Sequence, residues 1–268
     1  MTTVGILGAG GRMGRALVAA LADEQGLTLG AATLRPGHAE LDGDAGVLAG
    51  VGALDIALTD DLAAAAAAVD VLIDFTLPAA FEDNLQAAVS AGTPIVIGTT
   101  GLDAEAEAAL DGAASHIPIV QAANYSSGVT LMRRLAELAA GALGDDYDVE
   151  ILEAHHRLKK DAPSGTALAL GEAVAAARGV NLTEQSVRSR DGITGERPVG
   201  AIGFQTLRGG DIVGEHTVML AGQGERIELT HRASSRDTFA RGALRAAGWL
   251  VHQSAGRFDM EDVLGLSA

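Results

Sequence analysis

The chain has 268 residues and is 48% hydrophobic, which is enough for one large domain or two smaller ones. It has no cysteine, which excludes disulfides and thiolate metal sites, and its net charge of −16 argues against a nucleic-acid or anionic-membrane surface. No apolar run approaches the roughly 20 residues that span a bilayer. Because no basic leader precedes the first apolar segment, a cytoplasmic location is expected.

The first half of the chain alternates short apolar runs with helical patterns. Strands are predicted at residues 4–7, 28–32, 71–74, 95–97 and 117–120. Helices are predicted at about residues 11–22, 79–91 and 104–114, and the alanine-rich run 62–68 also reads as helix. Nearly continuous apolar strands that alternate with helices are typical of a parallel sheet covered on both faces. The predicted fold class is therefore α/β, with a Rossmann-type doubly wound parallel sheet domain, an architecture that binds many kinds of ligand.

After about residue 125 the pattern becomes mixed. A long helix at about 129–143 leads to an alternating strand at 148–154, and another helix is predicted from about residue 166. Residues 202–233 read as strands joined by Gly-rich turns, and a last helical pattern covers 238–252. These elements predict a second, α+β domain built on an open mixed sheet.

The glycine-rich segment 8–14 (GAGGRMG) directly follows the first predicted strand and opens the first predicted helix. Glycines at positions 8, 11 and 14 permit a tight turn, close approach of the backbone to a pyrophosphate, and tight packing of helix on strand. The start of the helix then offers N–H groups and a partial positive charge to the phosphates. Met13 stands where the commoner Gly-x-Gly-x-x-Gly form has its last glycine. A glycine cluster alone can be a simple turn, but at the start of a βαβ unit it indicates dinucleotide binding.

The second predicted strand is followed by Leu34 and Arg35. No carboxylate stands there, although NAD-selective sites use one to hold the ribose 2′-hydroxyl. An arginine at this place can pair with a 2′-phosphate and stack on adenine. The alternative is that Arg35 is an ordinary surface arginine before the Pro36–Gly37 turn. We expect NADPH to be preferred.

Two later loops also follow predicted strands, namely 98–101 (GTTG) and 122–125 (AANY). In a parallel sheet such loops line the crevice at the carboxyl ends of the strands, where nicotinamide would lie. Their small and hydroxyl side chains suit close approach to a flat ring, although taken alone they are ordinary turns.

The most informative segment is the basic run 153–166 (EAHHRLKKDAPSGT). It could be a solvated basic turn or an anion site without chemistry. A metal site is not predicted, because adjacent histidines on a strand point to opposite faces and no ligand set with metal spacing accompanies them. Ser164 or Thr166 would lie at a helix N-terminus, which binds carboxylates. The run therefore suits a small dianion that needs a proton donor; histidine titrates near neutrality, and surrounding cations can lower its pKa.

Sequence segments in a fixed order resemble those of the 4-hydroxy-tetrahydrodipicolinate reductase (dihydrodipicolinate reductase) family of the diaminopimelate and lysine pathway. They are GAGGRMG (8–14), DFT (74–76), GTTG (98–101), AANYS (122–126), EAHHRLKKDAPSGTA (153–167), IGFQTLRGGDIVGEHTV (202–218) and HRASSRDTFARGA (231–243). The resemblance covers essentially the whole chain. It implies reduction of 4-hydroxy-tetrahydrodipicolinate, through its dehydrated form, to tetrahydrodipicolinate with NADPH or NADH.

The resemblance also implies an organisation for the chain. A dinucleotide-binding domain is expected at 1–126, a substrate-binding and oligomerisation domain at 127–235, and a C-terminal segment at 236–268 that returns to the first domain. The substrate is a small dicarboxylate, and the family forms homotetramers through the sheets of the substrate domain.

Site residues follow from the same resemblance. His155 is the expected proton donor and Lys159 its partner. The expected contacts to substrate carboxylates are His156, Lys159, Ser164, Gly165 and Thr166. The expected cofactor contacts are Gly8, Ala9, Gly10, Gly11, Arg12, Met13, Arg35, Gly98, Thr99, Thr100, Ala122, Ala123, Asn124 and Tyr125. The chain departs from some relatives at Leu34, where they carry an acidic residue for the ribose, and at Leu158, where many carry a third histidine.

Two other functions are compatible with the residues alone. One is an NADP-dependent dehydrogenase of another small amino or sugar acid, which competition by pyridine-2,6-dicarboxylate would separate from the reductase. The other is a non-catalytic NADPH sensor, which would bind the cofactor without turnover. The presence of His155 and Lys159 counts against the sensor.

Overall fold

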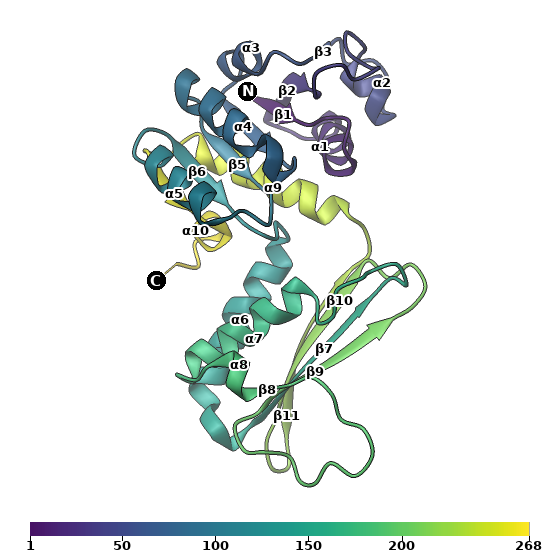
Figure 1. The fold of residues 1–268 in the computed structure, drawn as a ribbon, viewed down its shortest axis with the longest axis vertical. Helices are drawn as coiled ribbons and strands as arrows, with labels where there is room; N and C mark the ends of the chain where they lie inside the picture. Colours follow the sequence, from purple (N-terminus) through teal and green to yellow (C-terminus); the bar gives the residue numbers. More distant parts are fainter. Residues whose placement is uncertain (268) are drawn as a thin grey trace. The chain divides into compact units, whose positions relative to one another are not determined.

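The computed structural model describes residues 1–267, and these form two compact units (Figure 1). The first unit contains Met1–Ser127 together with the chain from Asp237 onward, and the second contains Gly128–Arg236. None of the helices within residues 1–267 combines the length and apolar character needed to cross a membrane.

The first unit is built on a seven-stranded parallel sheet with the order β12-β6-β5-β4-β1-β2-β3. Strand β1 pairs with β2 on one side and with β4 on the other, so the direction of winding reverses between β1 and β4. In sheets of this kind the crevice at the carboxyl ends of the strands beside that reversal is the usual ligand site. The strands are β1 (Thr2–Leu7), β2 (Leu27–Thr33), β3 (Leu58–Thr59), β4 (Val71–Asp74), β5 (Ile95–Ile97), β6 (Pro118–Gln121) and β12 (Gly256–Phe258).

Helices cover both faces of this sheet, each over its own apolar core. Helices α1, α9 and α10 pack on one face, while α3, α4 and α5 pack on the other. The alanine-rich run is helical, as predicted, and forms α3. The helices of this unit are α1 (Arg12–Ala22), α2 (Ala45–Ala49), α3 (Leu62–Ala67), α4 (Pro78–Ala91), α5 (Ala104–Ala113), α9 (Asp237–Leu250) and α10 (Met260–Leu264). The predicted doubly wound α/β fold is confirmed.

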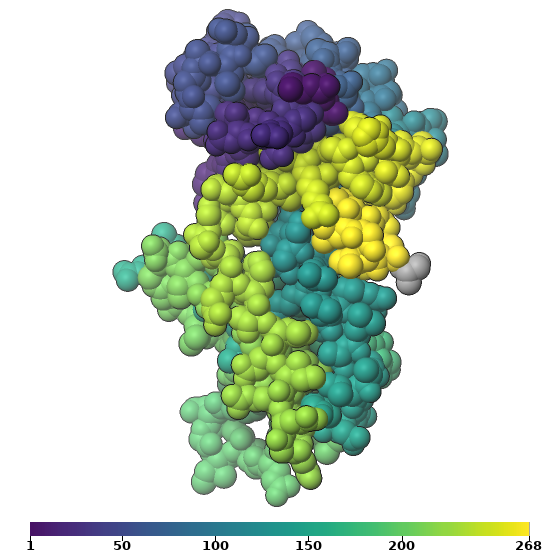
Figure 2. Space-filling model, turned by 180° about the vertical axis from the view of Figure 1, so that it is seen from behind, coloured from purple at the N-terminus to yellow at the C-terminus, as the bar shows by residue number. Residues whose placement is uncertain are grey.

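Helix α9 explains why the C-terminal segment belongs to the first unit. Its buried side chains, among them Leu244 and Leu250, share one core with Leu17 and Val18 of α1. Figure 2 shows the C-terminal segment in yellow lying against the N-terminal part of this unit. Trp249 of α9 also meets the ring of Phe258 on β12 edge to face, at a centroid distance of 5.1 Å.

The second unit has a five-stranded mixed sheet with the order β11-β10-β7-β9-β8. The central strand β7 runs parallel to β9 and antiparallel to β10, and the helices α6, α7 and α8 lie on one side of the sheet (Figure 1). The predicted open mixed sheet is confirmed. The elements are α6 (Ser127–Leu143), a 3-10 turn (Gly144–Asp146), β7 (Asp148–His155), α7 (Gly165–Ala177), α8 (Leu182–Gln185), β8 (Ser186–Val187), β9 (Ile202–Arg208), β10 (Gly214–Ala221) and β11 (Arg226–Ala233).

Candidate active site

Strand β7 delivers two polar side chains to the helix-covered face of its sheet. Side chains alternate along a strand, so residues 149, 151, 153 and 155 share this face. Val149 and Ile151 are fully buried, and they are followed by Glu153 at 2% and His155 at 9% exposure. Polar groups buried at the end of an apolar row require partners.

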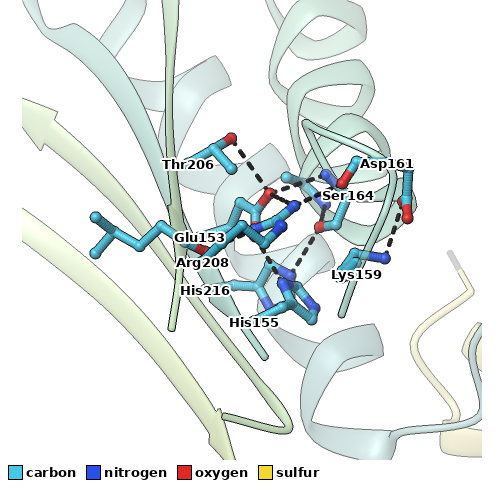
Figure 3. Close-up of polar contacts among 10 residues, drawn as sticks. Glu153, His155, Lys159, Asp161, Ser164, Thr206, Arg208 and His216 are labelled. Atoms are coloured by element: carbon cyan, nitrogen blue, oxygen red, sulfur yellow. Dashed lines mark hydrogen bonds and ion pairs between the residues drawn. The ribbon is translucent and has the colours of Figure 1, made fainter. Parts of the chain in front are cut away.

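Glu153 is the centre of those partnerships (Figure 3). One carboxylate oxygen lies 2.6 Å from Nδ1 of His155, and Arg208 donates to both oxygens at 2.8 Å. The backbone N–H of Ser164 adds a bond of 3.1 Å, and the Thr206 hydroxyl one of 3.3 Å. Burial alone would raise the pKa of Glu153, but the bonds from Arg208 and His155 outweigh it and lower this pKa to about 2. Glu153 is therefore a buried, permanently charged carboxylate.

The ring of His155 is held at one nitrogen only. Burial lowers the pKa of His155, the bond to Glu153 opposes that fall, and the charges of Lys159 and Arg208 add to it. The expected effect of cationic neighbours is present, but burial is the larger cause. Nε2 faces the space beside Gly214, where a Cβ would lie 3.1 Å from it, and within residues 1–267 no hydrogen bond to Nε2 is found.

His216 of β10 packs against this ring. The two imidazoles meet edge to face, with centroids 5.1 Å apart. Nε2 of His216 lies 3.2 Å from the hydroxyl of Ser164, while its buried Nδ1 has no hydrogen-bond partner among residues 1–267. Burial, assisted by the neighbouring His155, lowers the pKa of His216 to about 4, so this ring is neutral near pH 7.

Helix α7 begins beside the cluster, as the sequence predicted. Ser164 is its N-cap, and the Ser164 hydroxyl accepts from the backbone N–H of Ala167 at 3.2 Å. Gly165 and Thr166 lie in the first turn, and the backbone N–H groups of a first turn point toward the N-terminal end of the helix. The hydroxyl and the N–H of Ser164 are both engaged inside the protein, so its main effect is to fix the start of the helix.

The basic loop lies between β7 and α7. Nζ of Lys159 pairs with the carboxylate of Asp161 at 2.9 Å, and its side chain is 21% exposed. His156 is half-buried, whereas Leu158 is exposed. Two backbone bonds attach the loop to the turn after β9: Gly209 donates to the carbonyl of His155, and Arg157 donates to the carbonyl of Gly210.

The glycine-rich segment of the first unit forms the predicted strand-to-helix turn. Gly8 has a φ of +72°, and a Cβ on Gly14 would overlap the carbonyl oxygen of Gly8 and lie 2.7 Å from Cα of Ala9. Helix α1 therefore packs on the turn with backbone against backbone. Its N-cap, Gly11, makes no side-chain capping bond, and its first turn holds no acidic residue. A helix N-terminus of this kind accepts an anionic phosphate, so these residues fit a dinucleotide.

The end of β2 lies beside this turn. A Cβ on Gly10 would lie 2.8 Å from Cδ2 of Leu34, and Leu34 is 4% exposed. An apolar side chain therefore packs against the glycine-rich turn at the end of β2. Arg35, the next residue, is exposed, and within residues 1–267 it forms no ion pair.

The two later loops are tied together at the carboxyl ends of β4, β5 and β6. Thr99 donates its hydroxyl to Asp74 at 3.3 Å, and Asp74 also accepts from Asn84 and from the backbone N–H of Thr76. The Tyr125 hydroxyl donates to the carbonyls of Ile97 and Val120, so it joins the ends of two neighbouring strands. Ala122, Ala123 and Asn124 precede it in the same loop, and Gly98 and Thr100 flank Thr99.

Three residues of the β7 cluster were not predicted as parts of the site: Glu153, Arg208 and His216. Glu153 was detectable, because a residue two positions before His155 on a strand shares its face. Arg208 reaches His155 only through the pairing of β9 with β7, in which these two residues are register partners. His216 comes from the strand on the other side of β7.

Residues 2–125 match the family model of the dihydrodipicolinate reductase N-terminus, and residues 128–264 match that of its C-terminus. The chain belongs to this family. It is 60% identical over 265 residues to the 4-hydroxy-tetrahydrodipicolinate reductase of Alkalilimnicola ehrlichii, covering 99% of both chains. It is 54% identical over 266 residues to that of Hahella chejuensis, covering 99% of this chain and 100% of the relative. The predicted activity is confirmed: the chain is an NAD(P)H-dependent 4-hydroxy-tetrahydrodipicolinate reductase of lysine biosynthesis.

Solved structures share the fold of this dihydrodipicolinate reductase. A dipicolinate-bound dihydrodipicolinate reductase from Paenisporosarcina sp. TG-14 superposes with a TM-score of 0.76 at 22% identity, over 97% of each chain. A scyllo-inositol dehydrogenase from Lactobacillus casei with bound NAD(H) and scyllo-inositol has a TM-score of 0.58 at 14% identity, over 98% of this chain and 93% of that one. At these identities the likeness concerns the fold alone.

Proposed function

We propose that His155 is the proton donor of this reduction and that Lys159 is its charged partner. NAD(P)H, when bound, supplies the hydride that adds to the unsaturated imine of the dehydrated substrate. The resulting carbanion or enamine must then receive one proton from the protein. The observation that most supports His155 is its ring, which is held at Nδ1 by Glu153 and has no protein hydrogen bond at Nε2 within residues 1–267. When the ring is protonated, the proton on Nε2 is therefore available to a bound ligand.

The substrate carboxylates are proposed to bind at the start of α7. The first-turn N–H groups of Gly165 and Thr166 favour an anion, and Ser164 holds this turn in place. His156 and Lys159 lie in the loop before α7, and Lys159 adds positive charge. This charge also stabilises the negative charge that develops on the substrate ring when the hydride adds.

Competition by pyridine-2,6-dicarboxylate tests this assignment. This planar dianion should compete with the substrate when NADPH oxidation is followed in a coupled assay that makes the substrate from pyruvate and aspartate semialdehyde. A dehydrogenase of another small acid should turn over in that assay poorly and resist the inhibitor. A matched mono-acid, pyridine-2-carboxylate, is the control, because it can use only one of two carboxylate positions.

The cofactor is proposed to bind the first unit. The turn formed by Gly8, Ala9, Gly10, Gly11, Arg12 and Met13 would hold its pyrophosphate at the start of α1. The loops with Gly98, Thr99, Thr100, Ala122, Ala123, Asn124 and Tyr125 would hold the nicotinamide end. We accordingly propose that residues 1–126 with 236–268 bind the dinucleotide and that residues 127–235 bind the substrate.

NADPH is proposed as the preferred donor because of Arg35. The Arg35→Ala variant should lose kcat/KM with NADPH by about 10- to 100-fold, the scale of a hydrogen bond to a charged group, and change little with NADH. Steady-state kinetics with both cofactors measure this. Arg245→Ala, on the exposed side of α9, is the control and should leave the cofactor ratio unchanged. Equal kcat/KM for NADPH and NADH in the unsubstituted enzyme would contradict the role of Arg35.

We also propose a homotetramer formed through the sheet of the second unit. Strand β11 is an edge strand of eight residues, and its side chains are exposed or half-buried along the whole strand. Ile227, an apolar residue on this strand, is 41% exposed. Long edges of this kind are usually covered by another element or another chain.

A further inference from the structure

The charged atoms around His155 are arranged asymmetrically. At Nδ1 stands the buried carboxylate of Glu153, which can only accept a hydrogen bond at neutral pH. In the neutral imidazole Nδ1 must therefore carry the hydrogen, and Nε2 is left as the atom that takes up and gives back the second proton. The bond that one ring nitrogen makes decides the role of the other.

We propose that Glu153, held in place by Arg208, is a positioning residue that fixes the tautomer of His155 and keeps its protonated form available near neutral pH. This inference rests on the proposed role of His155 as proton donor. It explains how the His155 ring can be protonated although it is buried and lies near cations.

The elements around the His155 ring carry side chains that either favour or disfavour its protonation. Glu153 on β7 is an anion in direct contact with the ring. Lys159 in the loop and Arg208 on β9 are cations that disfavour a second positive charge, and His216 on β10 is neutral near pH 7. Burial also works against protonation. Glu153 therefore favours protonation of His155, whereas burial, Lys159 and Arg208 disfavour it.

The same carboxylate also connects the proton donor to the start of α7. One oxygen accepts from His155, and the other accepts from the backbone N–H of Ser164 at 3.1 Å. Arg208 bridges both oxygens and donates to the carbonyl of Asp161 at 2.6 Å, which ties in the loop before the helix. A rotation of the Glu153 carboxylate would therefore move His155 relative to the helix start that is proposed to bind substrate.

The test is the pH dependence of kcat/KM. A proton donor works only when protonated, so activity falls as pH rises through the pKa of His155. In Glu153→Gln the anion that raises this pKa is gone, so the pKa of His155 should fall. The basic limb of the pH profile, where kcat/KM declines with rising pH, should then move to lower pH by about one unit or more, the usual effect of a close opposite charge. Glu150→Gln is the matched control. It lies on the same strand and also loses a carboxylate–arginine pair, here with Arg190, but its basic limb should stay in place.

A second variant keeps the test decisive if Glu153→Gln folds poorly. Glu153→Asp keeps a carboxylate at this position but shortens its reach to Nδ1 of His155 by one methylene. The basic limb of its pH profile should therefore move to lower pH, by less than in Glu153→Gln. A purely structural role for Glu153 predicts lower activity with no shift of the limb in either variant, and that result would overturn the proposal.

The pKa of His155 can also be read without any reaction. Its Cε1–H NMR signal, assigned by its loss in His155→Gln, should titrate at lower pH in Glu153→Gln than in the unsubstituted enzyme. An unchanged titration would overturn the positioning role, whatever the kinetics. A normal kcat in His155→Gln would instead remove the proton-donor role on which the proposal rests, so the two failures are distinguishable.

Discussion

His155→Gln should lower kcat by about 100-fold or more, the usual scale of a lost general acid. Glutamine cannot deliver a proton at neutral pH, yet it fills much of the same space beside Gly214 and can still donate to Glu153. The proposed carboxylate contacts at the start of α7 are unchanged, so KM should stay within a few-fold of its normal value. Steady-state kinetics with saturating NADPH in the coupled assay measure both constants.

His116→Gln is the matched control, since His116 is exposed in the first unit and has no proposed role. It should leave kcat unchanged. Thermal unfolding of both variants should show that neither loses its fold. A kcat for His155→Gln within a few-fold of normal would exclude His155 as the proton donor and would direct attention to Lys159, its proposed charged partner.

The elements that the sequence predicted well are those with a signal of their own. Strands β1, β2, β4, β5 and β6 are short, mostly apolar runs, and each was placed to within two residues at either end, because this composition is typical of strands buried on both faces. Helix α9 was predicted at residues 238–252 and is found at Asp237–Leu250. Its return to the first unit was expected only through the family resemblance.

The elements that were missed depend on partners far along the chain. Strand β12 has three residues and exists because it pairs with β6. Its Arg257 is held by Glu107, Asp111 and Gln121, all more than a hundred residues earlier. Strand β3 has two residues, and α2 and α10 have five each, which is too short for a periodic pattern to develop.

The candidate site also combines features that the local sequence predicts with features that depend on distant parts of the chain. His155 and the start of α7 follow from one continuous run of sequence. The partners that set the chemistry of His155 come from the two neighbouring strands, since Arg208 is its register partner on β9 and His216 lies on β10. The pKa of His155 was expected to respond to nearby cations, but burial has the larger effect, and burial depends on the whole packed unit.

Gly242→Ala and Gly248→Ala should change stability in opposite directions, although both lie in α9. A Cβ on Gly242 would collide with the carbonyl oxygen of Tyr125 and lie 2.8 Å from its carbonyl carbon, and backbone cannot rotate away as a side chain can. We expect Gly242→Ala to cost about 3 kcal/mol, at the upper end for an overpacked core. For a chain of this size that lowers the thermal midpoint by roughly 6–12 °C.

A Cβ on Gly248 would meet only Cδ2 of Leu27 at 3.7 Å, an ordinary contact. Alanine is also the better helix former, so Gly248→Ala should raise stability by about 0.5–1 kcal/mol. Thermal unfolding of the two variants measures both effects. Equal changes in stability in the two variants would show that helix propensity, and not the close approach of Gly242 to Tyr125, decides the effect of alanine in α9.

The close approach at Gly242 has a consequence for function as well. Tyr125 ends the loop proposed to hold nicotinamide, and its hydroxyl joins the ends of β5 and β6. If α9 is displaced from the Tyr125 backbone, this loop must shift with it. Gly242→Ala should therefore raise the KM for NADPH several-fold even below its melting temperature, whereas Gly248→Ala should not. The C-terminal helix would then influence the proposed cofactor site through its close backbone approach to Tyr125.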